Sequence, residues 1–164
     1  MTRPLRRLLL AAVATPLLFA GHASPQVLPR NRPAARPAPR LEPVAETKLL
    51  MEGLLQANVR GLEKNLRQPP ADQETWTFVR GQALLVAETG NLLMLRPPKS
   101  GGQDAWMEAA AELRTKATAL AKTAAARDAD GGRRALADLA GTCNRCHQTF
   151  RVNVQITPFQ AAAE

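Results

Sequence analysis

Three pairs of helix-breaking residues constrain the fold of this chain more than any other feature. They are Pro69-Pro70, Pro97-Pro98 and Gly131-Gly132. A proline has no amide hydrogen to give to a helix, and a glycine loses more conformational freedom than any other residue when it is ordered in one. The pairs therefore predict turns, and they divide the chain after residue 42 into four segments of similar length.

Apolar residues recur at helical spacing in each segment. The first segment, about 43–67, and the third, about 103–127, place them three and four residues apart, on one face of a helix. The second, about 71–95, is apolar over a wider arc because Phe78 and Leu85 lie off its main stripe. We expect this segment to pack against two neighbours. Together the segments predict an all-α fold, an antiparallel four-helix bundle.

The fourth segment carries the residues with the most distinctive chemistry. Asp130 is its predicted N-cap, and the second segment is expected to start with Asp72 or another polar cap. The apolar stripe then runs into Cys143-Asn144-Arg145-Cys146-His147, which contains both cysteines of the chain. On a helix, positions 143, 146, 147 and 150 face the same side. Both sulfurs, the imidazole and the ring of Phe150 are therefore predicted to line one surface.

Cys-x-x-Cys-His is the attachment signature of haem c. In this interpretation Cys143 and Cys146 bond to the porphyrin, and His147 is the proximal ligand of the iron. A structural zinc site normally takes four Cys/His ligands, and the motif has three. A thioredoxin-like pair needs a βαβ setting, which the pattern lacks, and a plain disulfide would make poor use of the only cysteines. We expect one covalent haem c enclosed by the bundle, where it adds apolar burial to a small, alanine-rich domain.

The N-terminal segment is typical of an exported protein. Three arginines precede an apolar run from Leu8 to Ala20, and small residues up to Ala23 form a candidate cleavage site. The run is shorter than the about 20 apolar residues of a transmembrane helix, although an uncleaved anchor stays an alternative. We expect residues 1–23 to be a signal peptide, the protein to be periplasmic, and no stable membrane insertion to remain after cleavage.

Residues 24–42 alternate proline with arginine, and we expect them to form an extended linker. The leader and the linker carry most of the excess positive charge. The whole chain has a formal charge of +8, but from residue 43 onward 15 basic residues stand against 13 acidic ones, a net charge of +2. Nucleic-acid binding has no support in this distribution. The folded domain is expected over 43–152, with a C-terminal tail over 153–164 that is frayed at Pro158 and the alanine-rich end.

An exported four-helix domain with its haem motif on the last helix resembles the cytochrome c-prime and c-556 family. The resemblance covers about residues 43–152 and is most specific over 143–151. It implies that a basic residue four positions after the histidine, here Arg151, lies beside the proximal imidazole. The alternative is a surface charge that the dipole of the helix end favours. Phe150 is expected to pack against the haem.

The resemblance also implies that the first helix faces the distal side of the iron. The family's Arg-Gln-x-x-Met or Leu run corresponds to residues 51–55, so Leu55 takes the distal position. Met51 stands where the family commonly has an arginine that pairs with a haem propionate. The propionate partner is left open among Lys48, Arg60 and Arg96. Family members often form dimers through their first two helices, so a homodimer is a further expectation.

The sixth position on the iron decides between two functions. Because His22 lies in the predicted leader, the candidates are a methionine, a lysine, an exogenous molecule or nothing. Met51 is the best-placed methionine, ahead of Met94 and Met107. A His/Met iron suits electron transfer between redox partner proteins, whereas an open iron behind Leu55 suits binding of nitric oxide or carbon monoxide.

We expect electron transfer, with gas binding as the alternative. We expect no enzymatic activity, because the chain has no tyrosine, no distal histidine-arginine pair and no Glu-x-x-His pair. A sensor module that signals to a partner is a third class, with only the linker in its favour.

Overall fold

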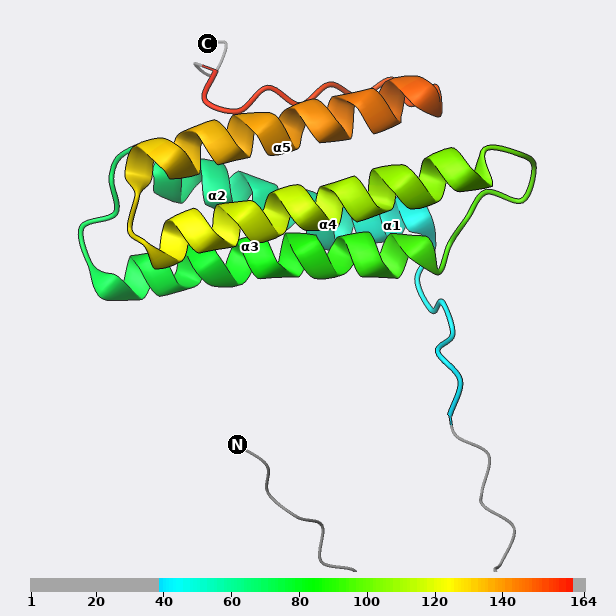
Figure 1. The fold of residues 1–164 in the computed structure, drawn as a ribbon, viewed down its shortest axis with the longest axis horizontal. Coiled ribbons are helices and arrows are strands. Elements are labelled where there is room, and N and C mark those ends of the chain that lie inside the picture. The colour runs from blue at the N-terminus through cyan, green and yellow to red at the C-terminus, as the bar shows by residue number, and fades with distance from the viewer. Residues whose placement is uncertain (1–38, 161–164) are drawn as a thin grey trace, which may run out of the picture. The chain divides into compact units, whose positions relative to one another are not determined.

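The computed structural model describes residues 39–160, and these residues form helices and connecting segments without a strand (Figure 1). The signal peptide predicted for 1–23 and most of the predicted linker lie outside the described residues. Residues 39–42, the end of that linker, are exposed and have no regular structure. The elements in chain order are α1 (Thr47–Leu50), the π-helix η1 (Met51–Gln56), α2 (Ala57–Leu66), α3 (Gln73–Met94), α4 (Gln103–Ala125) and α5 (Ala129–Thr149).

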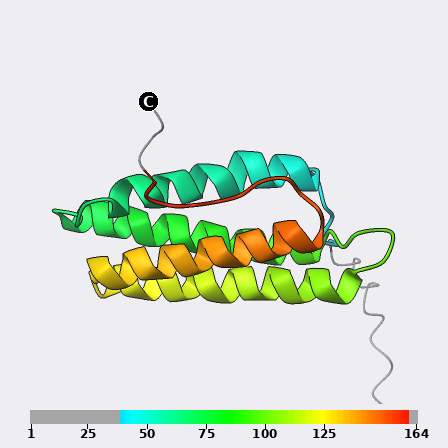
Figure 2. The same cartoon turned by 90° about the horizontal axis from the view of Figure 1, so that it is seen from above.

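The described chain is a four-helix bundle, which confirms the predicted fold class. The elements α1, η1 and α2 follow one another without a break, and we refer to them together as the first helix. Successive helices run in opposite directions, with α3 against α4 and α4 against α5, while the first helix packs on α3 (Figures 1 and 2). Five leucines are fully buried between them: Leu62, Leu66, Leu120, Leu136 and Leu139. None of the described helices is both long enough and apolar enough to cross a membrane.

Two of the three predicted breaks are confirmed, and the third is misplaced. The two proline pairs lie in the turns before α3 and α4. The pair Gly131-Gly132 instead lies buried inside α5, because the chain turns earlier, at Arg127, whose φ is 54°. A Cβ atom at Gly132 would lie 3.2 Å from Leu66 Cδ2. The second glycine therefore permits close packing of α5 on α2 and does not end a helix.

The earlier turn also changes the N-cap of α5. Its cap is Asp128, whose carboxylate accepts a hydrogen bond from the amide of Gly131 at 2.8 Å. The prediction of Asp130 is wrong, and the Asp130 side chain pairs with Arg133 on the surface. The corresponding prediction for α3 is confirmed, since Asp72 accepts from the amide of Thr75 at 2.7 Å.

Helix α3 does pack against two neighbours, the first helix and α4. Its wide apolar arc is not all core, however. Phe78 is 58% exposed and Leu85 is 47% exposed. The buried stripe runs instead through residues such as Val79, Ala83 and Val86. The off-stripe residues thus form an apolar patch on the outside of the bundle.

The expectation of a tail outside the folded domain is wrong for the residues that directly follow α5. We call Val152–Phe159 the C-terminal strap. It leaves α5 at a left-handed residue, Arg151, with φ 56°, and returns between α5 and the first helix (Figure 2). Ile156 and Phe159 pack against the hydrophobic core. The strap is therefore part of the domain, and only residues 161–164 lie outside the described part of this end.

Candidate cofactor site

The attachment motif lies in the last two turns of α5 and faces the first helix. Cys143 is buried, and Cys146 and His147 are half-buried. All three line a small hollow of about 20 Å³ that Met51 and Leu55 of η1 close from the opposite side. The rest of its wall is Leu93, Leu113 and Thr142. The fold thus brings the two thiols and the imidazole to the residues that the family resemblance implies on the distal side.

A much larger cavity, of about 880 Å³, adjoins this hollow. The two share Met51, Leu55, Cys146 and His147 as lining residues. The large cavity extends between the first helix, α5 and the C-terminal strap, and Trp106 of α4 contributes to its wall. Cavities that hold cofactors typically measure about 300–1,000 Å³. The large cavity has the thiol of Cys146 and the imidazole of His147 in its wall, and the thiol of Cys143 lies in the adjoining hollow. Its size and these donors fit a covalently bound haem.

The distal side of the site is built on an unusual helical turn. Met51–Gln56 forms a π-helix within the first helix. Such segments are rare and occur frequently at functional sites. Met51 lines both cavities, whereas Met94 and Met107 line neither. Met51 is accordingly the methionine that faces His147, and its role as a ligand stays a prediction.

The two residues between the cysteines also have defined partners. Arg145 forms an ion pair with Glu112 of α4, and Thr142 donates to the same carboxylate at 3.2 Å. The Asn144 side chain instead bonds to the backbone of Ile156 in the strap, both as donor and as acceptor, at 2.8 Å each. The motif is therefore tied to α4 on one side and to the strap on the other.

His147 is oriented by the strap as well. Its Nδ1 lies 3.0 Å from the carbonyl oxygen of Val154. A carbonyl oxygen only accepts hydrogen bonds, so Nδ1 carries the hydrogen when this bond forms. The lone pair is then on Nε2, the nitrogen left free to bind a metal.

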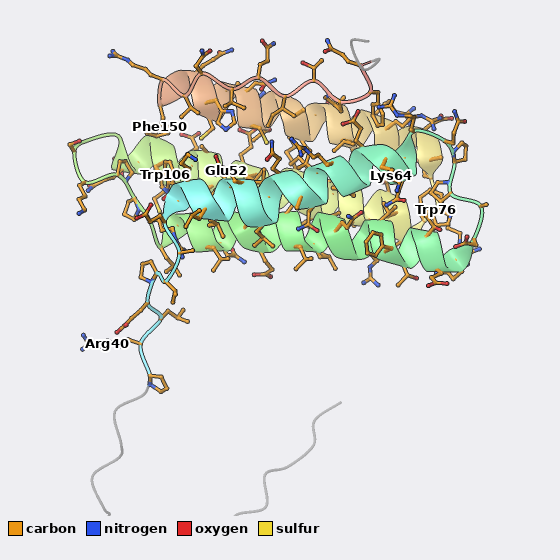
Figure 3. All side chains as sticks on the ribbon, turned by 180° about the vertical axis from the view of Figure 1, so that it is seen from behind. Arg40, Glu52, Lys64, Trp76, Trp106 and Phe150 are labelled. Atoms are coloured by element: carbon orange, nitrogen blue, oxygen red, sulfur yellow. The ribbon has the colours of Figure 1, made fainter. Side chains whose placement is uncertain are left out.

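Two aromatic side chains close one end of the large cavity. Phe150 and Trp106 pack edge to face, with ring centroids 5.1 Å apart and ring planes at 79° (Figure 3). The indole of Trp106 donates to the carbonyl of Leu93 at 2.7 Å. Phe150 lines the cavity in which it was predicted to pack on the haem. Trp106, which lies within the helix predicted for residues 103–127, lines the same cavity.

Arg151 lies outside both cavities. It is the left-handed residue that ends α5, where its amide donates to the carbonyl of Gln148 at 3.2 Å and the next amide, of Val152, to that of His147 at 2.8 Å. This pair of bonds is the Schellman motif, which satisfies carbonyls that a helix end leaves free. The arrangement and the exposed side chain favour the alternative role, a charged residue at a helix end.

The three candidate partners of a haem propionate differ in their surroundings. Lys48 and Arg60 both line the large cavity, and Lys48 also pairs with Glu52 at 2.7 Å. Arg96 lines neither cavity and donates to the carbonyls of Ala45 and Leu92, at 3.0 and 2.6 Å. These contacts favour Arg60, which no ion pair engages among the described residues.

Burial controls the reactivity of the two thiols. Desolvation, followed by the neighbouring Cys146, raises the pKa of Cys143 to about 12. Desolvation also raises the pKa of Cys146. The reactive form of cysteine is the thiolate, so both thiols are less reactive in the folded bundle than in the unfolded chain. Bond formation to a haem is therefore favoured before the bundle closes.

The strap is the part of the site that the sequence analysis missed. Its apolar residues Val152, Val154 and Ile156 alternate with polar ones, and this period of two is typical of extended chain packed on one side. That pattern could have predicted an extended segment. Nothing in the pattern indicated that Asn144 would hold it.

Residues 102–151 match the family described as Cytochrome C'. The match covers α4, the turn after it, α5 and the two residues that follow α5. It therefore includes the whole attachment motif. It confirms the resemblance over this segment and implies a haem c protein. No curated protein and no solved structure matches the chain.

Proposed function

We propose that this protein is an exported c-type cytochrome with a single haem that transfers electrons between redox partner proteins. One observation carries the proposal. The thiols of Cys143 and Cys146, the imidazole of His147 and the thioether of Met51 all line the same apolar hollow. The match of residues 102–151 to the Cytochrome C' family supports the haem, and the position of Met51 supports its use for electron transfer.

When bound, the haem supplies an iron that changes its charge by one electron. The two cysteines would hold the porphyrin, and His147 of α5 and Met51 of η1 would bind the iron. Arg60 would neutralise a propionate, and the apolar wall of the hollow would keep water away. A methionine opposite a histidine raises the reduction potential, which suits a carrier that accepts electrons from one protein and releases them to another.

Gas binding is the second candidate, and Leu55 favours it. Leu55 is only 5% exposed and lies beside Met51 in the same hollow, together with Leu93 and Leu113. An iron facing these side chains instead of Met51 would have an open and apolar distal side. Nitric oxide or carbon monoxide could bind there without a hydrogen-bond donor.

The optical spectrum of the purified, haem-loaded protein tests both candidates. We expect sharp bands on reduction, no response to carbon monoxide and, in the oxidised protein, the weak far-red band of a methionine–iron bond. Met51→Ala should remove that band and open the iron to carbon monoxide. Met107→Ala is the matched control, because Met107 is 42% exposed and lines neither cavity.

Two results would contradict the proposal in different ways. A wild-type spectrum that shifts with carbon monoxide would favour gas binding. Absence of covalent haem from protein produced in a host with a haem attachment system would contradict both candidates.

We further propose that the protein acts in the periplasm. We also propose that it forms a dimer through the first helix and α3. Leu49 of the first helix and Phe78 and Leu85 of α3 are exposed apolar side chains on these helices. Phe78 and Leu85 are seven residues apart on one helix and therefore share a face of α3, and exposed apolar side chains that share a face are typical of protein contacts.

A further inference from the structure

The C-terminal strap is fixed to the rest of the domain at both ends. At its start, the two hydrogen bonds of the Schellman motif reverse the chain directly after α5. At its far end, the amide of Phe159 donates to the carboxylate of Glu63 on α2 at 2.9 Å. The strap therefore bridges α5 and the first helix, and six of its residues line the large cavity: Val152, Val154, Gln155, Ile156, Thr157 and Pro158.

The middle of the strap is held in one register by Asn144. The side-chain amide donates to the carbonyl of Ile156, and its oxygen accepts from the amide of the same residue. Both groups of one peptide residue are thus paired by one side chain, as a neighbouring strand would pair them. A slip by one residue would break both bonds and turn Ile156 away from the core that it contacts.

This register places the carbonyl of Val154 at the imidazole of His147. The distance from Nδ1 to the carbonyl oxygen is 3.0 Å. A ring held in this way has a fixed tautomer and a fixed plane, and its second nitrogen is a stronger electron donor to a metal.

We infer that the C-terminal strap positions the proximal imidazole, and that Asn144, inside the attachment motif, holds the strap for this purpose. The inference rests on the proposed haem function and adds a second use for the motif. Asn144 is a positioning residue that acts on His147 through the strap. Because the hydrogen bond strengthens imidazole donation, it stabilises the oxidised iron and lowers the midpoint potential of the haem.

The test compares haem-loaded Asn144→Ala with Asn153→Ala. Asn153 is an exposed strap residue with no side-chain hydrogen bond among the described residues. Two quantities are measured: the midpoint potential and the hydrogen exchange rate of the His147 Nδ1–H, followed by NMR of reduced protein labelled with ¹⁵N-histidine. We expect Asn144→Ala to raise the potential and to speed the exchange about tenfold, the effect of losing one hydrogen bond. Asn153→Ala should change neither.

A second pair of variants leaves the motif intact, in case Asn144→Ala hinders haem attachment. A chain that ends at residue 153 lacks the Val154 carbonyl, and a chain that ends at residue 160 keeps it. Only the shorter chain should show the raised potential and the faster exchange. If the haem is attached in both and neither quantity differs between them, the inference is overturned while the proposed function stands. If wild-type protein carries no haem, the proposed function itself has failed.

Discussion

Burial of Cys143 gives the haem-free protein a characteristic dependence on pH. The thiol has an ordinary pKa of 9.0 in the unfolded chain and a pKa of about 12 in the bundle, mainly because it is desolvated. Between these values the unfolded chain has lost a proton that the folded protein keeps. Since stability falls with pH wherever the unfolded state binds fewer protons, the free energy of unfolding should decrease as the pH rises from about 9 to about 12.

Urea unfolding of protein produced without haem checks this prediction. By pH 12 the loss should be on the order of 4 kcal/mol, from three pKa units at about 1.4 kcal/mol each. Cys143→Ala removes the titrating group, so the difference between the two proteins isolates the thiol from the lysines. Parallel curves for the two proteins over this range would contradict the assigned burial. Below pH 9 the curves are expected to run parallel.

The residues of the attachment motif show which parts of the site could be predicted from the sequence. The motif predicted which atoms face one another along α5, because positions three and four apart share a helix face. It did not predict the partners of Asn144 and Arg145, which are Ile156 in the strap and Glu112 on α4. The motif leaves these two positions free to vary, so their roles depend on what packs beside them in the fold.

At the scale of one element, two substitutions distinguish the observed N-cap of α5, Asp128, from the predicted one, Asp130. Asp128→Ala removes the carboxylate that accepts from the Gly131 amide, and it should cost about 1 kcal/mol of stability. Asp130→Ala removes only an exposed pair with Arg133, which should cost about 0–0.5 kcal/mol. Chemical denaturation of the haem-loaded variants measures both. If Asp130→Ala lost more stability than Asp128→Ala, Asp130 would be the N-cap, as the sequence predicted.

Two glycines of α3 test how closely this helix approaches α4. A Cβ atom at Gly90 would lie 2.8 Å from the carbonyl oxygen of Ala110, a backbone atom, so the helices would have to separate. We expect Gly90→Ala to cost about 1–3 kcal/mol. Nothing lies within 4 Å of the corresponding position at Gly81, where alanine should stabilise the helix by about 0.5–1 kcal/mol.

The thermal unfolding of these two variants should therefore shift in opposite directions. Equal shifts would mean that α3 and α4 are farther apart than the structure has them. The helical period already places Gly90, and not Gly81, on the apolar stripe with Val79, Ala83 and Val86. Only the neighbouring helix shows how little space remains beside Gly90.

At the scale of the whole molecule, the outer apolar patch on α3 predicts self-association. We expect the mature protein to sediment as a dimer, and Phe78→Ser combined with Leu85→Ser to make it a monomer with an unchanged optical spectrum. Met107→Ser, on the exposed side of α4, should leave the dimer intact. A wild-type protein that is monomeric at every concentration would contradict the proposed pairing.

The amino-acid sequence by itself determined the number of helices, their approximate bounds, the apolar face of each and the position of the thiols and imidazole on α5. These features depend on residues within a few positions of one another. They can therefore be predicted from the helical period and the proline pairs. The helix starts were less certain, because a cap at 128 or 130 depends on where the preceding turn closes.

The family resemblance implied that Met51 and Leu55 lie on the distal side, but only the tertiary structure decided what else surrounds the motif. It exposed Phe78 and brought the strap back to α2. The bond between Phe159 and Glu63 joins residues 96 positions apart. No local pattern specifies such a contact, because it forms only after the helices have packed and left a groove that an extended segment can fill.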